Sequence, residues 1–337
     1  MKLHELGEFG LIRRIIAPRF TALQDRALGI GDDCAILPGD GAEDWLVTTD
    51  LLVEDVHFLR ARIPPRQLGR KSLAVNLSDI AAMGGTPAAC FLSISLPGDL
   101  DVEWLDAFFE GIREMADMSR CPLMGGDTTG SLRSIVINFA VVGRVARGRA
   151  KLRSGARAGD VLAVTGWLGD SGAGLQLLLE GKPIDCEDAE RLVTAHHDPR
   201  PHLEEGRWLG ARPEVTAMMD ISDGVDSDVR RILEQSGLGG AVIDLDALPK
   251  SEFMRRICAR YGWDSAELAA SAGEDYCLLV AVDPSGYEGL SRDFLARFGR
   301  PLAQIGVLSA SGGVLYRKGG APAALRRSGF DHFRSPP

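Results

Sequence analysis

The stretch Ala74-Val75-Asn76-Leu77-Ser78-Asp79-Ile80-Ala81-Ala82-Met83-Gly84 combines an apolar and a polar pattern on one predicted helix. This helix follows Pro64-Pro65 and ends near Met83, where two glycines supply stop signals. Its apolar residues recur at helical spacing and predict a buried stripe of Leu73, Leu77, Ile80 and Ala81. A different face presents a hydroxyl, an amide and a carboxylate together, from Ser72, Asn76 and Asp79. The alternative interpretation is a polar face exposed to solvent.

Strands and helices alternate on both sides of this helix. Before residue 150, strands are predicted at 45–49, 88–96 and 134–145, and a second helix at 102–118. The polar, glycine-bearing segment 151–159 lacks periodicity and is interpreted as the boundary between domains at 1–150 and 151–337. Beyond it we expect strands at 161–165, 216–219, 241–245 and 276–282, and helices at 170–179, 225–235 and between 185 and 209. The pattern predicts a two-domain α/β protein.

Length and composition indicate a globular enzyme-like chain. The 337 residues are 45% hydrophobic and 25% charged, and they include 40 glycines, which favours two domains with a sizeable core. A net charge of -9 argues against a nucleic-acid partner, since binding phosphates along a duplex requires clustered Lys and Arg. No signal peptide or membrane span is recognised, so we expect a cytoplasmic protein. The 6 cysteines are dispersed and are interpreted as reduced core residues.

Aspartate recurs beside Gly, Ser or Thr along the chain. The motifs are Gly31-Asp32-Asp33, Thr48-Thr49-Asp50, Leu77-Ser78-Asp79, Gly125-Gly126-Asp127-Thr128-Thr129, Asp220-Ile221-Ser222-Asp223-Gly224 and Gly273-Glu274-Asp275. Mg²⁺ takes oxygen ligands and commonly shares them with substrate phosphates, while glycine lets backbone N–H groups approach a phosphate closely. Any single motif is also explained by turn chemistry. Together they indicate a site for metal and polyphosphate.

Other nucleotide and hydrolase signatures are missing. The chain has no G-x-x-x-x-G-K-[ST] loop, no set of protein-kinase motifs and no G-x-S-x-G elbow. The stretch from Thr165 to Gly174 is interpreted as a packing turn that opens a helix, with a peripheral phosphate contact as the alternative. His196-His197 is interpreted as a pair at a helix end and not as a metal site.

Five runs closely resemble the thiamine-monophosphate kinase family. They are Gly29-Ile30-Gly31-Asp32-Asp33-Cys34-Ala35, Thr48-Thr49-Asp50-Leu51-Leu52-Val53-Glu54-Asp55-Val56-His57-Phe58, the stretch from Ala74 to Gly84, Gly125-Gly126-Asp127-Thr128-Thr129 and Ile221-Ser222-Asp223-Gly224. The similarity extends from Gly7-Glu8-Phe9 to Gly329-Phe330-Asp331-His332-Phe333. It implies the fold of the aminoimidazole-ribonucleotide-synthetase superfamily, in which an N-terminal mixed sheet pairs in a homodimer and a C-terminal α/β domain completes the active site.

The resemblance also implies an activity and its residues. The activity is ATP-dependent phosphorylation of thiamine monophosphate to thiamine diphosphate by direct in-line transfer with several Mg²⁺ ions. The family's metal ligands fall on Asp33, Thr48, Thr49, Asp50, Asp79, Asp127, Asp220 and Asp223. ATP contacts fall on Gly126, Asp127, Arg153 and Ser222, and thiamine contacts fall on His57, Glu274 and Phe330. Asp50, Asp127 and Arg153 are expected to be catalytic.

Simpler interpretations of three of these residues stay open. His57 would only cap or pack near the end of the Val53 segment, Arg153 would be a surface charge at the domain boundary, and Glu274 would only satisfy the start of a strand. Two other functions also stay open. One is another ATP-using member of the superfamily, of the selenophosphate synthetase or hydrogenase-maturation dehydratase type, and the other is a sensor that binds thiamine phosphate without catalysis.

Overall fold

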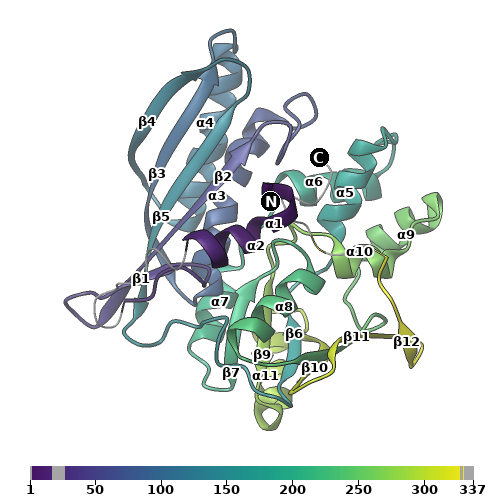
Figure 1. The fold of residues 1–337 in the computed structure, drawn as a ribbon. Helices are drawn as coiled ribbons and strands as arrows, with labels where there is room; N and C mark the ends of the chain where they lie inside the picture. Colours follow the sequence, from purple (N-terminus) through teal and green to yellow (C-terminus); the bar gives the residue numbers. More distant parts are fainter. Residues whose placement is uncertain (1, 17–26, 327–328, 330–337) are drawn as a thin grey trace.

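The first half of the chain forms a five-stranded sheet in the order β1-β2-β5-β3-β4 (Figure 1). The computed structural model describes residues 2–16, 27–326 and 329. The strands are β1 Ala35–Leu37, β2 Glu43–Val53, β3 Thr86–Pro97, β4 Leu123–Ser131 and β5 Val136–Ala146. β3 and β4 are parallel, and the other neighbours are antiparallel. In β2, buried Leu46, Thr48 and Leu52 alternate with more exposed residues, so one face is packed and the other is open.

Two long helices cover the packed face of this sheet, α3 (Pro65–Ala82) and α4 (Val102–Ser119) (Figure 1). The predicted stripe of α3 is confirmed, because Leu73, Leu77 and Ile80 are fully buried. Its polar face is buried as well, with Ser72 1% and Asn76 0% exposed. The solvent-exposed alternative for this face is therefore wrong, and α3 packs on more than one side.

The second half forms a seven-stranded sheet in the order β12-β11-β8-β10-β6-β9-β7. Its strands are β6 Val161–Val164, β7 Val215–Asp220, β8 Gly240–Asp244, β9 Leu278–Val282, β10 Ala303–Ser309, β11 Gly313–Lys318 and β12 Ala321–Ala323. The helices are α5 Asp170–Leu179, α6 Glu187–His197, α7 Leu203–Gly210, α8 Val225–Gln235, α9 Glu252–Tyr261, α10 Ser265–Ser271 and α11 Pro284–Phe298. The alternation of strands and helices predicted for this half is confirmed, with α9 to α11 and β10 to β12 in addition.

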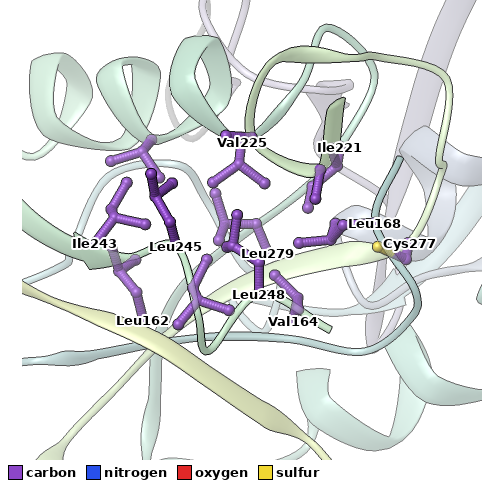
Figure 2. Packing of buried hydrophobic residues seen from close by; sticks show 14 of the residues in the cluster. Leu162, Val164, Leu168, Ile221, Val225, Ile243, Leu245, Leu248, Cys277 and Leu279 are labelled. Atoms are coloured by element: carbon purple, nitrogen blue, oxygen red, sulfur yellow. The ribbon is translucent and has the colours of Figure 1, made fainter. Parts of the chain in front are cut away.

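The core of this half supports the carboxyl end of β7. Figure 2 shows Val225 and Ile221 packed with Leu279 and neighbouring aliphatic side chains of the same cluster. Ile221 N donates to Cys277 O at 2.8 Å, which fixes the chain immediately after Asp220. Burial of these apolar groups holds a polar loop at a defined place on the edge of the sheet.

The two halves meet closely along α3. A Cβ atom on Gly206 of α7 would lie 2.2 Å from Ala81 O, and one on Gly210 would lie 2.8 Å from Gly84 Cα. Only glycine permits this approach of backbones. Arg70 Nε also donates to Asp198 Oδ1 at 2.8 Å across the same boundary.

Three short helical segments precede the first sheet, α1 Leu3–Leu6, α2 Glu8–Leu11 and η1 Ile12–Ile16. No helix in the described part of the chain combines the length and apolar character that a membrane span needs.

Candidate metal and phosphate site

Three aspartates from distant parts of the chain converge at the boundary between the two sheets. Carboxylate oxygens of Asp33, Asp79 and Asp220 all lie within 4.8 Å of one another. Asp33 precedes β1, Asp79 stands in the last turn of α3, and Asp220 ends β7. The cluster therefore draws on both sheets, and the helix α3 lies between them.

Neighbouring polar groups hold these carboxylates. Thr48 Oγ1 donates a hydrogen bond to Asp79 Oδ2, and Ser78 Oγ donates to Asp220 Oδ2 at 2.6 Å. Asn76 Oδ1 accepts from the backbone N–H of Asp50 at 2.9 Å. The buried polar face of α3 thus contacts β2 on one side and β7 on the other. Ser78 was missed as a site residue, although it directly precedes Asp79 in the motif.

Electrostatic repulsion and burial make the ionised form of this cluster unfavourable when no cation is bound. Burial, followed by the charge of Asp33, raises the pKa of Asp220 to about 7. Burial, followed by the charges of Asp33 and Asp223, raises the pKa of Asp50 to about 6. Burial and the neighbouring carboxylates also raise the pKa of Asp79 well above its usual range. Crowded carboxylates with raised pKa values are typical of functional sites.

Arg153 lies against the Asp32-Asp33 pair. Its Nη2 donates to Asp33 Oδ1 at 2.5 Å, and its backbone N–H donates to Asp32 Oδ2 at 3.1 Å. Although burial opposes the charge, Asp33 and Asp32 raise the pKa of the Arg153 guanidinium. The other oxygen, Asp33 Oδ2, is buried without a hydrogen-bond partner among the described residues. An unsatisfied carboxylate oxygen beside two further carboxylates fits a hard divalent cation such as Mg²⁺.

Two of the predicted metal ligands point away from this cluster. Thr49 is exposed on the open face of the first sheet, where its Oγ1 accepts from Asn138 Nδ2 at 2.8 Å. Asp127 pairs with Ser93, which lies on the same open face. The row that contains Asp50 reaches β4 at Gly126 after three strand spacings, roughly 14 Å. The structure therefore does not bring Asp127 to Asp50 within one chain.

Gly126 is required by the packing of β4 against β3. Its φ is 155°, and a Cβ atom there would lie 1.7 Å from Leu92 O on β3. β4 can therefore pair with β3 at this point only through glycine. The whole of β4 before Ser131 is exposed at the edge of the sheet.

The loop after β7 places Ser222 and Asp223 near the cluster. Ser222 is half-buried, and its carbonyl accepts from Glu274 N at 2.8 Å. Arg231 of α8 donates to Asp223 Oδ2 and lies 3.3 Å from Asp228 Oδ1. Asp223 is thus held by an ion pair in this structure. Asp228 and Arg231 were not predicted to lie near the site, because the sequence alone does not tell which side of α8 faces it.

The predicted thiamine contacts occupy different surroundings. His57 Nδ1 accepts from Val53 N at 3.0 Å, so His57 caps the turn after β2. Glu274 lies between two domains, with Lys71 Nζ 3.0 Å from its Oε1 and His196 Nδ1 3.1 Å from its Oε2. Phe330 lies outside the described residues. Lys71 and His196 were missed as partners of this site, since neither stands in a recognisable motif.

Comparison with known proteins covers almost the whole chain. The family model for the N-terminal domain of AIR synthase related proteins matches residues 31–145, and the model for their C-terminal domain matches residues 157–316. The thiamine-monophosphate kinase of Salmonella typhimurium is 39% identical over 98% of this chain and 99% of its own length. The Bacillus subtilis thiamine-monophosphate kinase is 32% identical over 98% of this chain and 100% of its own length.

Solved structures give the same grouping. The structure of AaThiL complexed with AMPPCP and TMP is 33% identical and covers 98% of this chain and 99% of its own, with a TM-score of 0.86. The thiamine monophosphate kinase of Aquifex aeolicus is 32% identical over 96% of this chain and 99% of its own, with a TM-score of 0.80. Escherichia coli HypE, a hydrogenase maturation protein, shares the fold at 24% identity, covering 86% of this chain and 88% of its own with a TM-score of 0.70.

Proposed function

The chain belongs to the thiamine-monophosphate kinase family, and we infer on that premise that it transfers the γ-phosphoryl group of ATP to thiamine monophosphate. The products are thiamine diphosphate and ADP. The observation that carries this proposal is the cluster of Asp33, Asp79 and Asp220, which brings both sheets to one site. Phosphoryl transfer depends chiefly on positioning and on charge stabilisation, and carboxylates that hold Mg²⁺ supply both.

We propose that Asp33, Asp79 and Asp220 hold Mg²⁺, with Asp50 beside them. Bound Mg²⁺ would neutralise phosphate charge and thereby lessen the repulsion between two polyanions. Thr48 and Ser78 fix the orientations of Asp79 and Asp220, so the ligands are arranged before the metal arrives. Asp223 would join them only after its contact with Arg231 rearranges.

The remaining groups of the site act on the phosphates. Arg153 is positioned by Asp32 and Asp33, and we propose that it stabilises charge on the transferring group. The Ser222 hydroxyl would donate to a phosphate oxygen. The acceptor is a phosphate monoester whose second pKa is near 6, so it is largely a dianion at neutral pH. Transfer in line therefore requires no separate general base.

We further propose a homodimer formed through the open face of the first sheet. Support comes from the exposed apolar residues on this side of the domain, which include Trp45, Leu51 and Phe91. Asp127 and Thr49 lie on this same face, and β4 is an exposed edge strand. In this arrangement Asp127 would serve a site that includes the second copy, which accounts for its separation from Asp50.

We keep the domain division at residue 150 as a proposal, supported by the end of β5 at Ala146 and the start of β6 at Val161. We also propose a cytoplasmic location, supported by six cysteines that are all free. Of the alternative functions, the hydrogenase-maturation type shares only the fold at 24% identity. The complete set of carboxylates argues against a sensor without catalysis, because binding alone would tolerate the loss of several metal ligands.

The test is an assay of the purified protein with ATP, Mg²⁺ and thiamine monophosphate, followed by chromatography of thiamine diphosphate and ADP. We expect equal amounts of the two products and no product when Mg²⁺ is replaced by EDTA. Hydrolysis of ATP without thiamine diphosphate would point to another member of the superfamily. Binding of thiamine monophosphate without turnover would point to a sensor.

A further inference from the structure

A buried lysine contacts the proposed thiamine-binding carboxylate from the opposite domain. Lys71 of α3 is 0% exposed, and its Nζ donates to Glu274 Oε2 at 3.0 Å and lies 3.0 Å from Oε1. Glu274 comes from the loop before β9, in the other half of the chain. The ammonium faces both oxygens of one carboxylate, which is the arrangement that a fixed ion pair requires.

His196 contacts the same carboxylate from a second side. Its Nδ1 lies 3.1 Å from Glu274 Oε2 and 3.1 Å from Ser171 Oγ. Burial and the nearby Lys71 charge lower the pKa of His196, so the ring is neutral at pH 7. A neutral imidazole beside a carboxylate stabilises it as an N–H donor and adds no net charge.

The backbone of Glu274 is fixed as tightly as its side chain. Its φ is 63°, in the left-handed region that non-glycine residues rarely adopt, and its N–H donates to Ser222 O at 2.8 Å. A Cβ atom on the preceding Gly273 would lie 2.3 Å from Ser222 O. The loop therefore fixes the distance between the segment at Ser222, which we propose contacts phosphate, and the carboxylate of Glu274.

We propose that Lys71 is a positioning residue that, with His196, sets Glu274 as an ionised hydrogen-bond acceptor whose charge is already balanced. This inference rests on the proposed function and deepens it. The side chain of Glu274 is 23% exposed while that of Lys71 is 0% exposed, so a ligand can contact the Glu274 side chain and not the ammonium. Although burial opposes ionisation, Lys71 and His196 hold the pKa of Glu274 well below its usual range.

A charge-balanced carboxylate selects its ligand by hydrogen bonding more than by net charge. The thiazolium ring of thiamine monophosphate carries the positive charge but no N–H group, and its hydroxyethyl oxygen is esterified. The amino group of the pyrimidine ring is the N–H donor of this molecule. Glu274 therefore accepts from the pyrimidine amino group, and Lys71 makes the enzyme specific for an amino-bearing acceptor.

The experiment compares steady-state kinetics of wild type, Lys71→Met, Lys71→Arg and Lys71→Met/Glu274→Gln. Lys71→Met should raise KM for thiamine monophosphate at least about tenfold, as expected for a weakened charge-assisted hydrogen bond, with kcat and KM for ATP within about threefold. Lys71→Arg keeps the charge and should recover part of the affinity. The double variant leaves no unpaired buried charge, so it keeps the test valid where Lys71→Met folds poorly, and it should show the same rise in KM.

Arg70→Met is the matched control, because it removes the neighbouring ion pair from α3 to Asp198 across the same boundary. It should leave KM for thiamine monophosphate within about twofold. A second readout is an acceptor that lacks the pyrimidine amino group: wild type should discriminate against it at least about tenfold in kcat/KM, and Lys71→Met should lose most of this discrimination.

An unchanged KM in folded Lys71→Met, or an equal rise in Arg70→Met, would overturn the positioning role while leaving the proposed function intact. A wild-type protein that makes no thiamine diphosphate would overturn both.

Discussion

Asp33, Asp79 and Asp220 illustrate, at the scale of single residues, a trade of stability against the metal binding that we propose for them. Each carboxylate is partly or fully buried, and each lies close to two others. Like charges in a buried site destabilise the folded chain unless protons or cations balance them. Burial and the neighbouring carboxylates raise the pKa of Asp79 well above its usual range and that of Asp220 to about 7, which reflects this cost.

Asp220→Asn tests this trade directly. Asn keeps the acceptor for Ser78 Oγ but removes one negative charge. We expect kcat to fall at least roughly 100-fold, as for the loss of one electrostatic stabiliser. We also expect a higher melting temperature than wild type in EDTA, and a smaller increase when Mg²⁺ is added. Asp99→Asn, at an exposed turn, is the control. Equal melting temperatures and full activity would remove Asp220 from the site.

The buried histidine His197 gives the folded protein a definite response to acid. It is 4% exposed, and burial, with the nearby His196 and Lys71, lowers its pKa to about 3. The unfolded chain binds this proton near pH 6.5 and the folded chain does not, so stability from this group is lost as pH falls below about 6.5.

His197→Gln should therefore be less sensitive to acid than wild type. Between about pH 7.5 and about pH 5.5, the difference in unfolding free energy should shift in favour of the variant by about 1 kcal/mol. Urea unfolding of both proteins in EDTA measures this shift. Parallel pH dependences would mean that His197 takes up its proton in the folded state.

Residue patterns alone predict part of the site. The aspartate motifs indicate a metal and polyphosphate site in general terms, the family resemblance assigns metal ligands to Asp33, Asp79 and Asp220, and the fold places these three together. Lys71 gave no signal, since a lysine in an amphipathic helix is normally solvated. Its partner stands 203 positions away, so only the packing of the two halves reveals the pair. Asp127 shares the motif pattern yet lies on the open face.

At the scale of elements, α3 determines the geometry of the site. It packs against β2, α4, α7 and β7, and side chains from three of its sides are buried. The sequence predicted its bounds because an apolar period and glycine stop signals are local features. β4 was not predicted as a strand, because an exposed glycine-rich segment lacks the alternation by which strands are recognised.

Gly69→Ala tests how closely α3 and α4 approach. A Cβ atom on Gly69 would lie 2.0 Å from Phe108 O on α4, a backbone atom that cannot rotate away. Alanine favours a helix over glycine by about 1 kcal/mol, but here the clash should outweigh this gain and lower stability by roughly 1–3 kcal/mol. Gly289→Ala in α11 is the control, because its Cβ atom would meet only Arg292 Nη2, at 3.9 Å. The control should be stabilised; a stabilised Gly69→Ala would show that the helices can separate.

At the scale of the whole molecule, the open face of the first sheet is the surface that we assign to a second copy of the chain. This face arises because side chains alternate along β2. Every second residue is buried under α3, and the residues between them are exposed. The composition of the chain predicts neither this face nor its partner, because an exposed leucine is common on monomers.

Leu51→Asp should separate the proposed dimer. Leu51 is 50% exposed on β2, so a carboxylate there is solvated in a monomer but unpaired in a dimer interface. We expect the wild-type protein to sediment as a dimer and the variant as a folded monomer with much lower activity. Leu315→Asp, at an exposed position on β11, should leave the mass unchanged. A monomeric wild type with full activity would contradict the dimer and the role proposed for Asp127.

The carboxylate cluster also bears on how firmly the two halves of the chain are joined. Its ligands come from both sheets, so an ion held by them would act as a removable cross-link, much as a disulfide ties distant segments of a secreted protein. In the proposed reaction the substrate phosphates would share this ion, and their binding would therefore tighten the joint between the halves. With Mg²⁺ bound as proposed, chelation would loosen that joint, and the concentration of free Mg²⁺ would set how firmly the two halves of the enzyme are held.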